Sequence, residues 1–214
     1  MLEIKEQQLL DESIVYMRAA HRSINQKRKY GGHDYEDHPQ AAIDMALYFG
    51  ITDIHLLRAL ACHDIPEDVT ALNPKYNLFD ISQKFGQRVG AIVFGLTHVY
   101  TKEAYPFLNK KSRNTLECGR LFECDKDVHT CKLIDIIVNT ADCIKYYDED
   151  PKFCDQFREK CVQLLPFLYK GNEAVRYRAD MNLQDLTKCK PSRVFDAVGK
   201  GVTETQRKMK EGLL

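Results

Sequence analysis

An adjacent histidine and aspartate, His63 and Asp64, are the residues of this chain whose types and spacing could most directly do chemistry. Imidazole nitrogen and carboxylate oxygen are ligands that a divalent first-row metal accepts. A further histidine, His38, lies upstream, and a further aspartate, Asp135, lies far downstream. The pattern predicts one metal ion held by these four side chains, with spare coordination positions open to water or a phosphate oxygen. Taken alone, the dipeptide would be an ordinary solvated helix end.

The residues that follow His63 place a second pair of acids beside it. An apolar helical run at residues 56–61 ends at the His–Asp pair, and Pro66 then turns the chain and presents Glu67 and Asp68. Four ionisable groups so close to an apolar helix are costly to bury unless a cation neutralises them. A carboxylate held near a metal-activated water can also take its proton, which makes this second pair candidate catalytic residues.

Asp135 lies in the most apolar segment of the chain. A single aspartate there needs a cation or several hydrogen bonds to offset the loss of water. Asn139 is four residues further on and therefore shares its helix face. The alternative partner of Asp135 is Lys132, but that pairing would leave the two histidines unexplained.

A group of basic residues follows Pro106. Lys110, Lys111 and Arg113 could supply the positive charge that a pentavalent phosphoryl transition state needs. A solvated basic turn is an alternative of equal weight.

The elements that must position these side chains are all predicted to be helices. Hydrophobic periodicity places them at residues 5–25, 39–50, 53–63, 81–98, 112–123, 128–145 and 151–168. Thr52 or Asp53 is expected to cap the third helix, and Asp80 the fourth. The predicted fold is therefore all-α, with one domain at residues 1–168. Residues 169–214 form a C-terminal extension of open role, and its last part, 199–214, is expected to be loosely ordered.

Composition narrows the functional classes. Among the 214 residues, Lys plus Arg (31) balance Asp plus Glu (31), so no global charge attracts nucleic acid or an anionic membrane. No apolar stretch approaches the ~20 residues that span a bilayer, and the N-terminus has no signal-peptide pattern. The eight cysteines include no C-x-x-C pair, which favours buried thiols over zinc ligands or disulfides. These features predict a soluble, cytoplasmic protein, and they leave open whether it forms a homo-oligomer.

Four segments of the chain form a recognisable set of motifs. They are Tyr35-Glu36-Asp37-His38-Pro39, His63-Asp64-Ile65-Pro66-Glu67-Asp68, Phe85-Gly86-Gln87-Arg88-Val89 with Gly95-Leu96-Thr97, and Lys132-Leu133-Ile134-Asp135 with Asn139. Over roughly residues 5–165, they resemble the HD superfamily of metal-dependent phosphohydrolases. The resemblance is greatest to the hydrolase domain of the bacterial alarmone synthetase/hydrolases and to their small single-domain relatives. The resemblance implies an HD-domain helical bundle.

The resemblance also implies roles for individual residues. One Mn²⁺ per chain, or another divalent ion, would be held by His38, His63, Asp64 and Asp135. Glu67 and Asp68 would position and deprotonate the attacking water. The substrate would be contacted by Arg28, Lys29 and Asn139. The implied reaction removes the 3′-pyrophosphate from guanosine tetra- or pentaphosphate and releases GDP or GTP.

The chain departs from the family pattern only on the substrate side. The loop between Arg28 and His38 is one residue longer, through Gly31-Gly32, and Ala141 stands where relatives usually carry an arginine. Other HD hydrolases therefore remain as alternatives: a nucleoside 5′-monophosphatase, a deoxynucleoside triphosphate hydrolase, or an enzyme acting on an adenosine alarmone or NADPH. A binuclear site is disfavoured because His98 and His129 lie in no paired context. A non-catalytic nucleotide sensor would have no need of Glu67 and Asp68.

Overall fold

The protein is built from helices throughout the residues that the computed structural model describes, which are 2–29 and 31–189. The α-helices are α1 (Ile4–Ser23), α2 (Asp37–Tyr48), α3 (Ile54–Cys62), α4 (Leu78–Phe85), α5 (Gln87–Leu96), α6 (Lys110–Glu123), α7 (Lys126–Lys145), α8 (Pro151–Leu164) and α9 (Glu173–Lys188). Three short turns complete them: η1 (Ile65–Val69), η2 (Tyr147–Glu149) and η3 (Leu165–Phe167). No strand forms within these ranges, where Lys27 and Asp34 make only an isolated bridge. The prediction of an all-α fold is confirmed.

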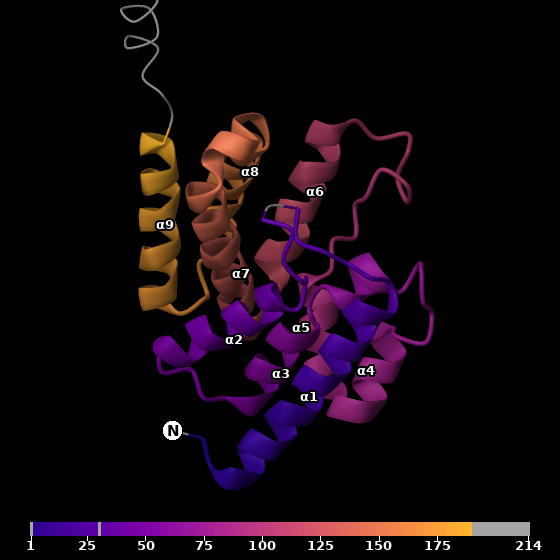
Figure 1. Cartoon of the computed structure of the whole chain (residues 1–214). Coiled ribbons are helices and arrows are strands. Elements are labelled where there is room, and N and C mark those ends of the chain that lie inside the picture. The colour runs from indigo at the N-terminus through magenta and orange to yellow at the C-terminus, as the bar shows by residue number, and fades with distance from the viewer. Residues whose placement is uncertain (1, 30, 190–214) are drawn as a thin grey trace, which may run out of the picture.

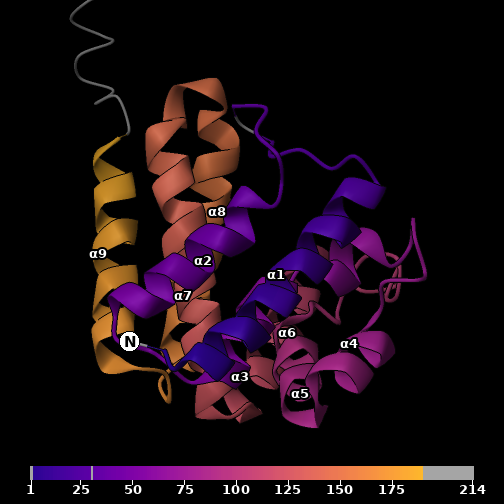
Figure 2. The same cartoon turned by 60° about the horizontal axis from the view of Figure 1, so that its bottom comes forward.

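The helices form two groups joined through α2 and α3. In Figures 1 and 2, α7, α8 and α9 stand side by side, while α1, α3, α4 and α5 pack together as the second group. α2 crosses between the groups and contacts both α3 and α7. This arrangement brings the C-terminal end of α3, one end of α2 and the middle of α7 together, which is where the predicted metal ligands lie.

The apolar segment at 128–145 is a buried helix, as predicted. Within α7, Leu133, Ile134, Ile136 and Ile137 are all buried in the main core. A helix that is apolar on several faces has to be surrounded, and α7 packs against α2, α3, α5, α8 and α9. None of the described helices has the length and apolarity needed to cross a membrane.

One predicted helix is in fact two. The expected helix at 81–98 with Asp80 as its cap is wrong, because α4 begins at Leu78 and the Asn77 side chain accepts the backbone N–H of Asp80. Gly86 then separates α4 from α5 with φ of 97°, a conformation that residues with a side chain rarely adopt. The basic residues after Pro106 also lie in a helix, since Asn109 caps α6 and Lys110 begins it.

The proposed boundary at residue 168 remains a prediction, but part of the extension contributes to the core. In α9, Val175, Ala179 and Leu183 are buried against α7 and belong to the same apolar cluster. Residues 190–214, including the segment expected to be loosely ordered, lie outside the described residues.

Close packing of α4 against α5 gives a first testable prediction. A Cβ at Gly90 would lie 1.9 Å from Ser82 Oγ and 2.8 Å from Ser82 Cβ. Gly90→Ala is therefore expected to lower the free energy of unfolding by about 1–3 kcal/mol, through overpacking. Urea denaturation measures the change. As a control, Gly119→Ala introduces a Cβ with no heavy atom within 4 Å and should add up to about 1 kcal/mol of stability, because alanine favours helix. Equal stability of the two variants would contradict the prediction.

Candidate active site

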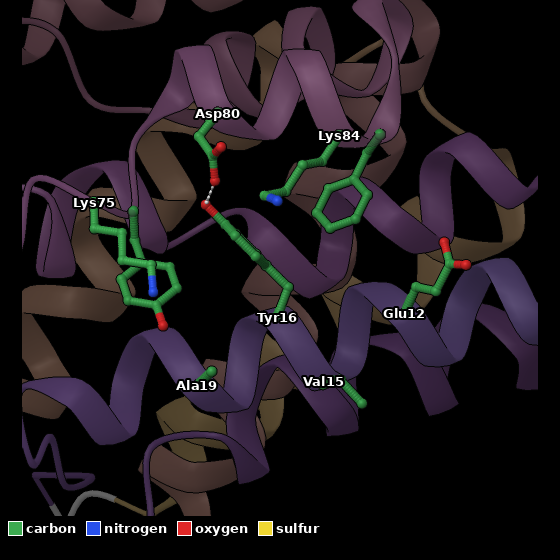
Figure 3. A pocket seen from close by; sticks show the side chains of 9 residues that line it. Glu12, Val15, Tyr16, Ala19, Lys75, Asp80 and Lys84 are labelled. Atoms are coloured by element: carbon green, nitrogen blue, oxygen red, sulfur yellow. Dashed lines mark hydrogen bonds between the residues drawn. The ribbon is translucent and has the colours of Figure 1, made fainter.

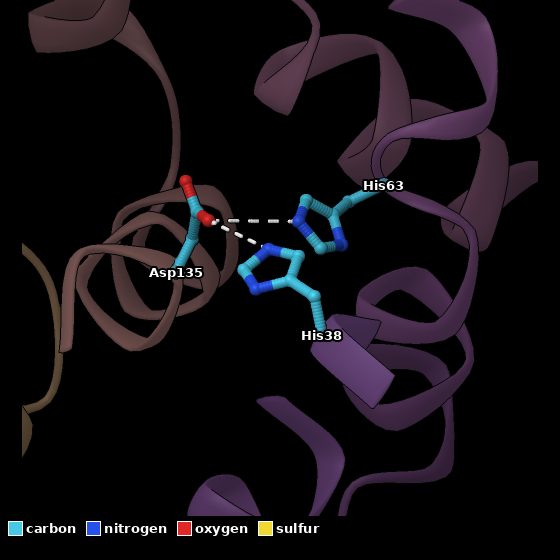
Figure 4. Close-up of side chains that lie close together, drawn as sticks. All are labelled: His38, His63 and Asp135. Atoms are coloured by element: carbon cyan, nitrogen blue, oxygen red, sulfur yellow. Dashed lines mark ion pairs between the residues drawn. The ribbon is translucent and has the colours of Figure 1, made fainter. Parts of the chain in front are cut away.

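The predicted metal ligands come together from three separate elements. His38 lies in the first turn of α2, His63 and Asp64 directly follow α3, and Asp135 is near the middle of α7. Figure 4 shows both imidazoles turned toward one oxygen of Asp135, which lies 3.3 Å from His38 Nε2 and 3.6 Å from His63 Nε2. An oxygen of Asp64 is 3.4 Å from His38 Nε2 and 3.1 Å from His63 Nε2.

His38, His63 and Asp135 have the chemistry and spacing of a group that could hold a divalent metal ion, and Asp64 lies beside their imidazoles. Two ligands at right angles, each about 2.1 Å from a common ion, are about 3 Å apart, close to the observed separations. His63 Nδ1 donates to the carbonyl of Leu60 at 2.8 Å, so in the neutral imidazole that binds a metal Nε2 carries the lone pair. That buried Nε2 has no hydrogen-bond partner, as expected of an atom that binds a metal. The residues therefore fit a divalent cation.

The charges around the cluster favour a cation as well. Burial by itself lowers the pKa of His63, but Asp64 and Asp135 outweigh it and raise that pKa to about 9. Burial would raise the pKa of Asp135, but Lys132 and the two histidines hold it well below the usual range of an aspartate. The site thus offers concentrated negative charge to a positive ion.

Asp135 uses its two oxygens for two purposes. One oxygen faces the histidines, while the other accepts from Lys132 Nζ at 2.9 Å. Asn139, one helical turn on, donates to the backbone carbonyl of Asp135 at 3.1 Å and to the oxygen that faces the histidines. The lysine pairing that the sequence offered as an alternative is therefore present together with the metal-type cluster, and it orients the carboxylate.

Glu67 and Asp68 lie on η1, directly after the His–Asp pair. Glu67 Oε1 accepts the backbone N–H of His98 at 2.8 Å, and Asp68 Oδ2 accepts from Gln26 Nε2 at 2.8 Å. Glu67 remains exposed, yet removal of water by the surrounding protein raises the pKa of its carboxyl. The two carboxylates are thus fixed by hydrogen bonds from different sides of the site.

Each of the two carboxylates lines a different cavity. The smaller, of about 300 Å³, is called here the Arg28 cavity. Its lining includes Lys29, Asp68 and Asn139. Arg28 donates to Asn139 Oδ1 at 3.2 Å and to Asp142 at 2.5 Å. The sequence-predicted substrate residues Arg28, Lys29 and Asn139 therefore share one cavity with Asp68.

The larger cavity, of about 960 Å³, is called the Lys111 cavity. Glu67 lines it together with the three basic residues that the sequence singled out, Lys110, Lys111 and Arg113. Sequence reasoning missed two further cations in its wall, Lys102 and Lys160, because they come from other segments. The aromatic side chains of Phe153 and Phe157 line both cavities, so the two adjoin.

Tyr35 is another residue whose role the sequence did not reveal. Its hydroxyl donates to Asp64 Oδ2 at 2.8 Å, which orients a predicted metal ligand. Burial first, and the charges of Asp64 and Asp68 next, raise the pKa of this tyrosine, so the hydroxyl stays a donor. The one feature of the sequence that could have indicated this role is the position of Tyr35, three residues before His38.

Comparisons with known proteins agree with this architecture at the level of the fold. No family model and no curated protein matches the chain. Among solved structures, it is similar to one described as a metazoan ortholog of SpoT that hydrolyzes ppGpp and plays a role in starvation responses. The TM-score is 0.68 at 20% sequence identity, over 82% of this chain and 94% of that chain. The chain therefore shares the fold of that protein.

Proposed function

We propose that this protein is a metal-dependent phosphohydrolase that removes the 3′-pyrophosphate from guanosine tetra- or pentaphosphate. The observation that carries the proposal is the buried cluster of His38, His63 and Asp135, with Asp64 beside it. Glu67 and Asp68, the candidate catalytic carboxylates, follow His63 and Asp64 in the sequence. Glu67 lines the Lys111 cavity and Asp68 lines the Arg28 cavity, which adjoins it. The likeness in fold to a ppGpp hydrolase supports the same reaction class.

The two cavities differ as the two ends of such a substrate do. The Arg28 cavity combines aromatic walls with hydrogen-bonding groups, which suits a nucleoside. The Lys111 cavity carries five cations, Lys102, Lys110, Lys111, Arg113 and Lys160, against two acids, Glu67 and Glu159. That excess of positive charge suits a polyphosphate group. A nucleotide that carries phosphate groups at both the 3′ and the 5′ position of the ribose would use both cavities.

The chemistry follows from the His–Asp cluster and from Glu67 and Asp68, the two carboxylates beside it. A divalent ion, proposed to be one Mn²⁺ per chain, would lower the pKa of bound water and offset phosphate charge. Glu67, whose pKa is raised, can take a proton from the attacking water, while Gln26 holds Asp68 in place for the same task. Lys110, Lys111 and Arg113 would offset charge on the phosphoryl oxygens as the bond to the 3′-oxygen breaks.

The products test the proposal directly. Guanosine 3′,5′-bispyrophosphate incubated with the protein and Mn²⁺ is expected to give GDP and intact pyrophosphate, because attack occurs at the 3′-linked phosphorus. Anion-exchange chromatography separates these products. Adenosine analogues, NADPH, nucleoside 5′-monophosphates and deoxynucleoside triphosphates belong in the same panel. If the protein released orthophosphate from a nucleoside monophosphate and left bispyrophosphates intact, the proposed substrate would be wrong, whereas the proposed metal site would still stand. Tight binding without any turnover would instead indicate a nucleotide sensor.

Arg28 is expected to act on substrate affinity more than on turnover. Arg28→Ala removes a charged donor from the wall of the Arg28 cavity, and the nucleotide is charged both before and during the reaction. KM should rise about tenfold to a hundredfold, matching the about 1.5–3 kcal/mol of a hydrogen bond to a charged group, while kcat changes less. Arg22→Ala is the control, because Arg22 is exposed, pairs with Glu36 and lines neither cavity. A fall in kcat with KM unchanged would assign Arg28 to the chemical step.

A cytoplasmic location is part of the same proposal. Burial raises the pKa of the thiols of Cys62, Cys131 and Cys143, which keeps them protonated and inert. These three cysteines are buried apolar side chains, as the sequence predicted.

A small nucleotide is the proposed binding partner of the protein, and the proposal includes neither nucleic acid nor a membrane.

A further inference from the structure

A third cavity, of about 550 Å³, opens between α1, α4 and the segment that joins η1 to α4 (Figure 3). It is called here the Tyr16 pocket. None of its lining residues lines the Arg28 cavity or the Lys111 cavity. Its volume lies within the range of about 300–1,000 Å³ that small-molecule sites occupy. The proposed reaction makes no use of it.

One wall of the Tyr16 pocket is aromatic and rigid. The ring of Tyr16 meets the rings of Tyr76 and Phe85 edge to face, with centroid separations of 5.2 Å in each case. Tyr76 and Phe85 are 8% and 7% exposed, so packing holds them in place. The Tyr16 hydroxyl donates to Asp80 Oδ2 at 2.7 Å, which also fixes the central ring. A planar ring can pack on such a wall without reordering it.

The charged groups in and beside the Tyr16 pocket include more cations than anions, because Lys75, Lys84 and the neighbouring Arg58 stand against Glu12 and Asp80. Its two carboxylates already have partners: Glu12 lies 3.4 Å from Arg58, and Asp80 accepts from Tyr16. Lys75 and Lys84 stand on either side of Tyr16 in Figure 3. Within the part of the chain that the structure describes, no carboxylate lies within 4.0 Å of either ammonium group. These two lysines can therefore take an anion.

We propose that the Tyr16 pocket is a second ligand site, for a planar aromatic compound that carries a phosphate, of the class of a nucleoside monophosphate. The aromatic wall would take the base, and Lys75 and Lys84 would bind the phosphate. Inorganic phosphate alone would leave the aromatic wall bare, and a neutral nucleoside would leave the lysines unpaired. The proposal does not depend on the proposed hydrolysis, because the two sites share no residues.

Photo-crosslinking locates the bound ligand. The probe is 8-azidoadenosine 5′-monophosphate, irradiated with the full-length protein, and peptide mass spectrometry identifies the labelled segments. Label is expected within residues 12–19 or 75–85. The double variant Lys75→Ala with Lys84→Ala should lower that labelling at a fixed probe concentration by at least about tenfold, because two charged contacts are lost. Ala19→Phe should also abolish it, since Ala19 lines the pocket and is exposed, so the larger side chain fills the pocket without disturbing the core.

Lys5→Ala with Lys126→Ala is the matched control. It removes the same charge from exposed positions that line none of the three cavities, and its labelling should equal that of the unmodified protein. Circular dichroism verifies that all variants are folded. The proposal is overturned if the unmodified protein carries no label in these two segments. It is also overturned if either pocket variant is labelled there as strongly as the control.

Discussion

Replacing His63 by alanine is expected to remove the bound divalent ion and with it the hydrolytic activity. The variant loses an imidazole whose Nε2 faces both Asp64 and Asp135 within 3.6 Å. Metal catalysis contributes several kcal/mol, so activity should fall by about 10³-fold or more. Elemental analysis of the protein dialysed against a limiting amount of Mn²⁺ measures the ion content, and product release measures the activity. Chelation of the unmodified protein should have the same effect.

His55→Ala provides the matched control for this experiment. His55 lies at the opposite end of α3 from His63 and outside the cluster, so the variant should keep one ion per chain and its activity. Asp135→Asn tests the carboxylate separately, because the amide keeps the shape but loses the charge that attracts the ion. Two ions per chain, or full activity in a protein without any ion, would refute a site with a single metal.

The double variant Glu67→Gln with Asp68→Asn is expected to keep both the ion and the nucleotide but to turn over about 10²–10⁴-fold more slowly. Amides preserve the size of the side chains and cannot take a proton from water. Single-turnover kinetics measure the chemical step, and equilibrium binding of the substrate verifies that affinity is retained. Glu36→Gln with Asp37→Asn is the matched control, since this neighbouring Glu–Asp pair lines neither of the two cavities. If the control lost as much turnover as the test variant, or if the test variant lost none, the proton acceptor would have to be a group other than Glu67 and Asp68.

The pH profile separates Glu67 from Asp68. A base works only in its ionised form, so the rate should fall as pH drops through the pKa of Glu67. Removal of water raises that pKa, which places the acid limb above the ordinary value of a glutamate. Glu67→Gln should abolish this limb, while Asp68→Asn should lower the rate and leave the position of the limb unchanged. A limb that persists in Glu67→Gln would assign it to another group.

Local interactions explain which parts of the fold could be predicted from the sequence. Helix periodicity and caps depend on residues only a few positions apart, so the helices corresponding to α1, α2, α3 and α7 were predicted to within a few residues. The helix predicted at 81–98 failed for a conformational reason. Apolar spacing continues through Gly86, but its positive φ breaks the backbone, and spacing alone carries no information on φ.

The sequence by itself determined which chemical groups the protein has, whereas only the tertiary structure decided how they are combined. His38, His63 and Asp135 were recognisable as metal-ligand types, because ligand chemistry belongs to the residue. Their separations of a few ångströms depend on how α2, α3 and α7 cross, which long-range packing determines. Asp135 meets His38 and His63 as well as Lys132, and the contacts to the two histidines also depend on long-range packing. The same is true of the walls of the cavities and of the burial of α9. Each requires side chains distant in sequence to meet, and no local pattern specifies such a contact.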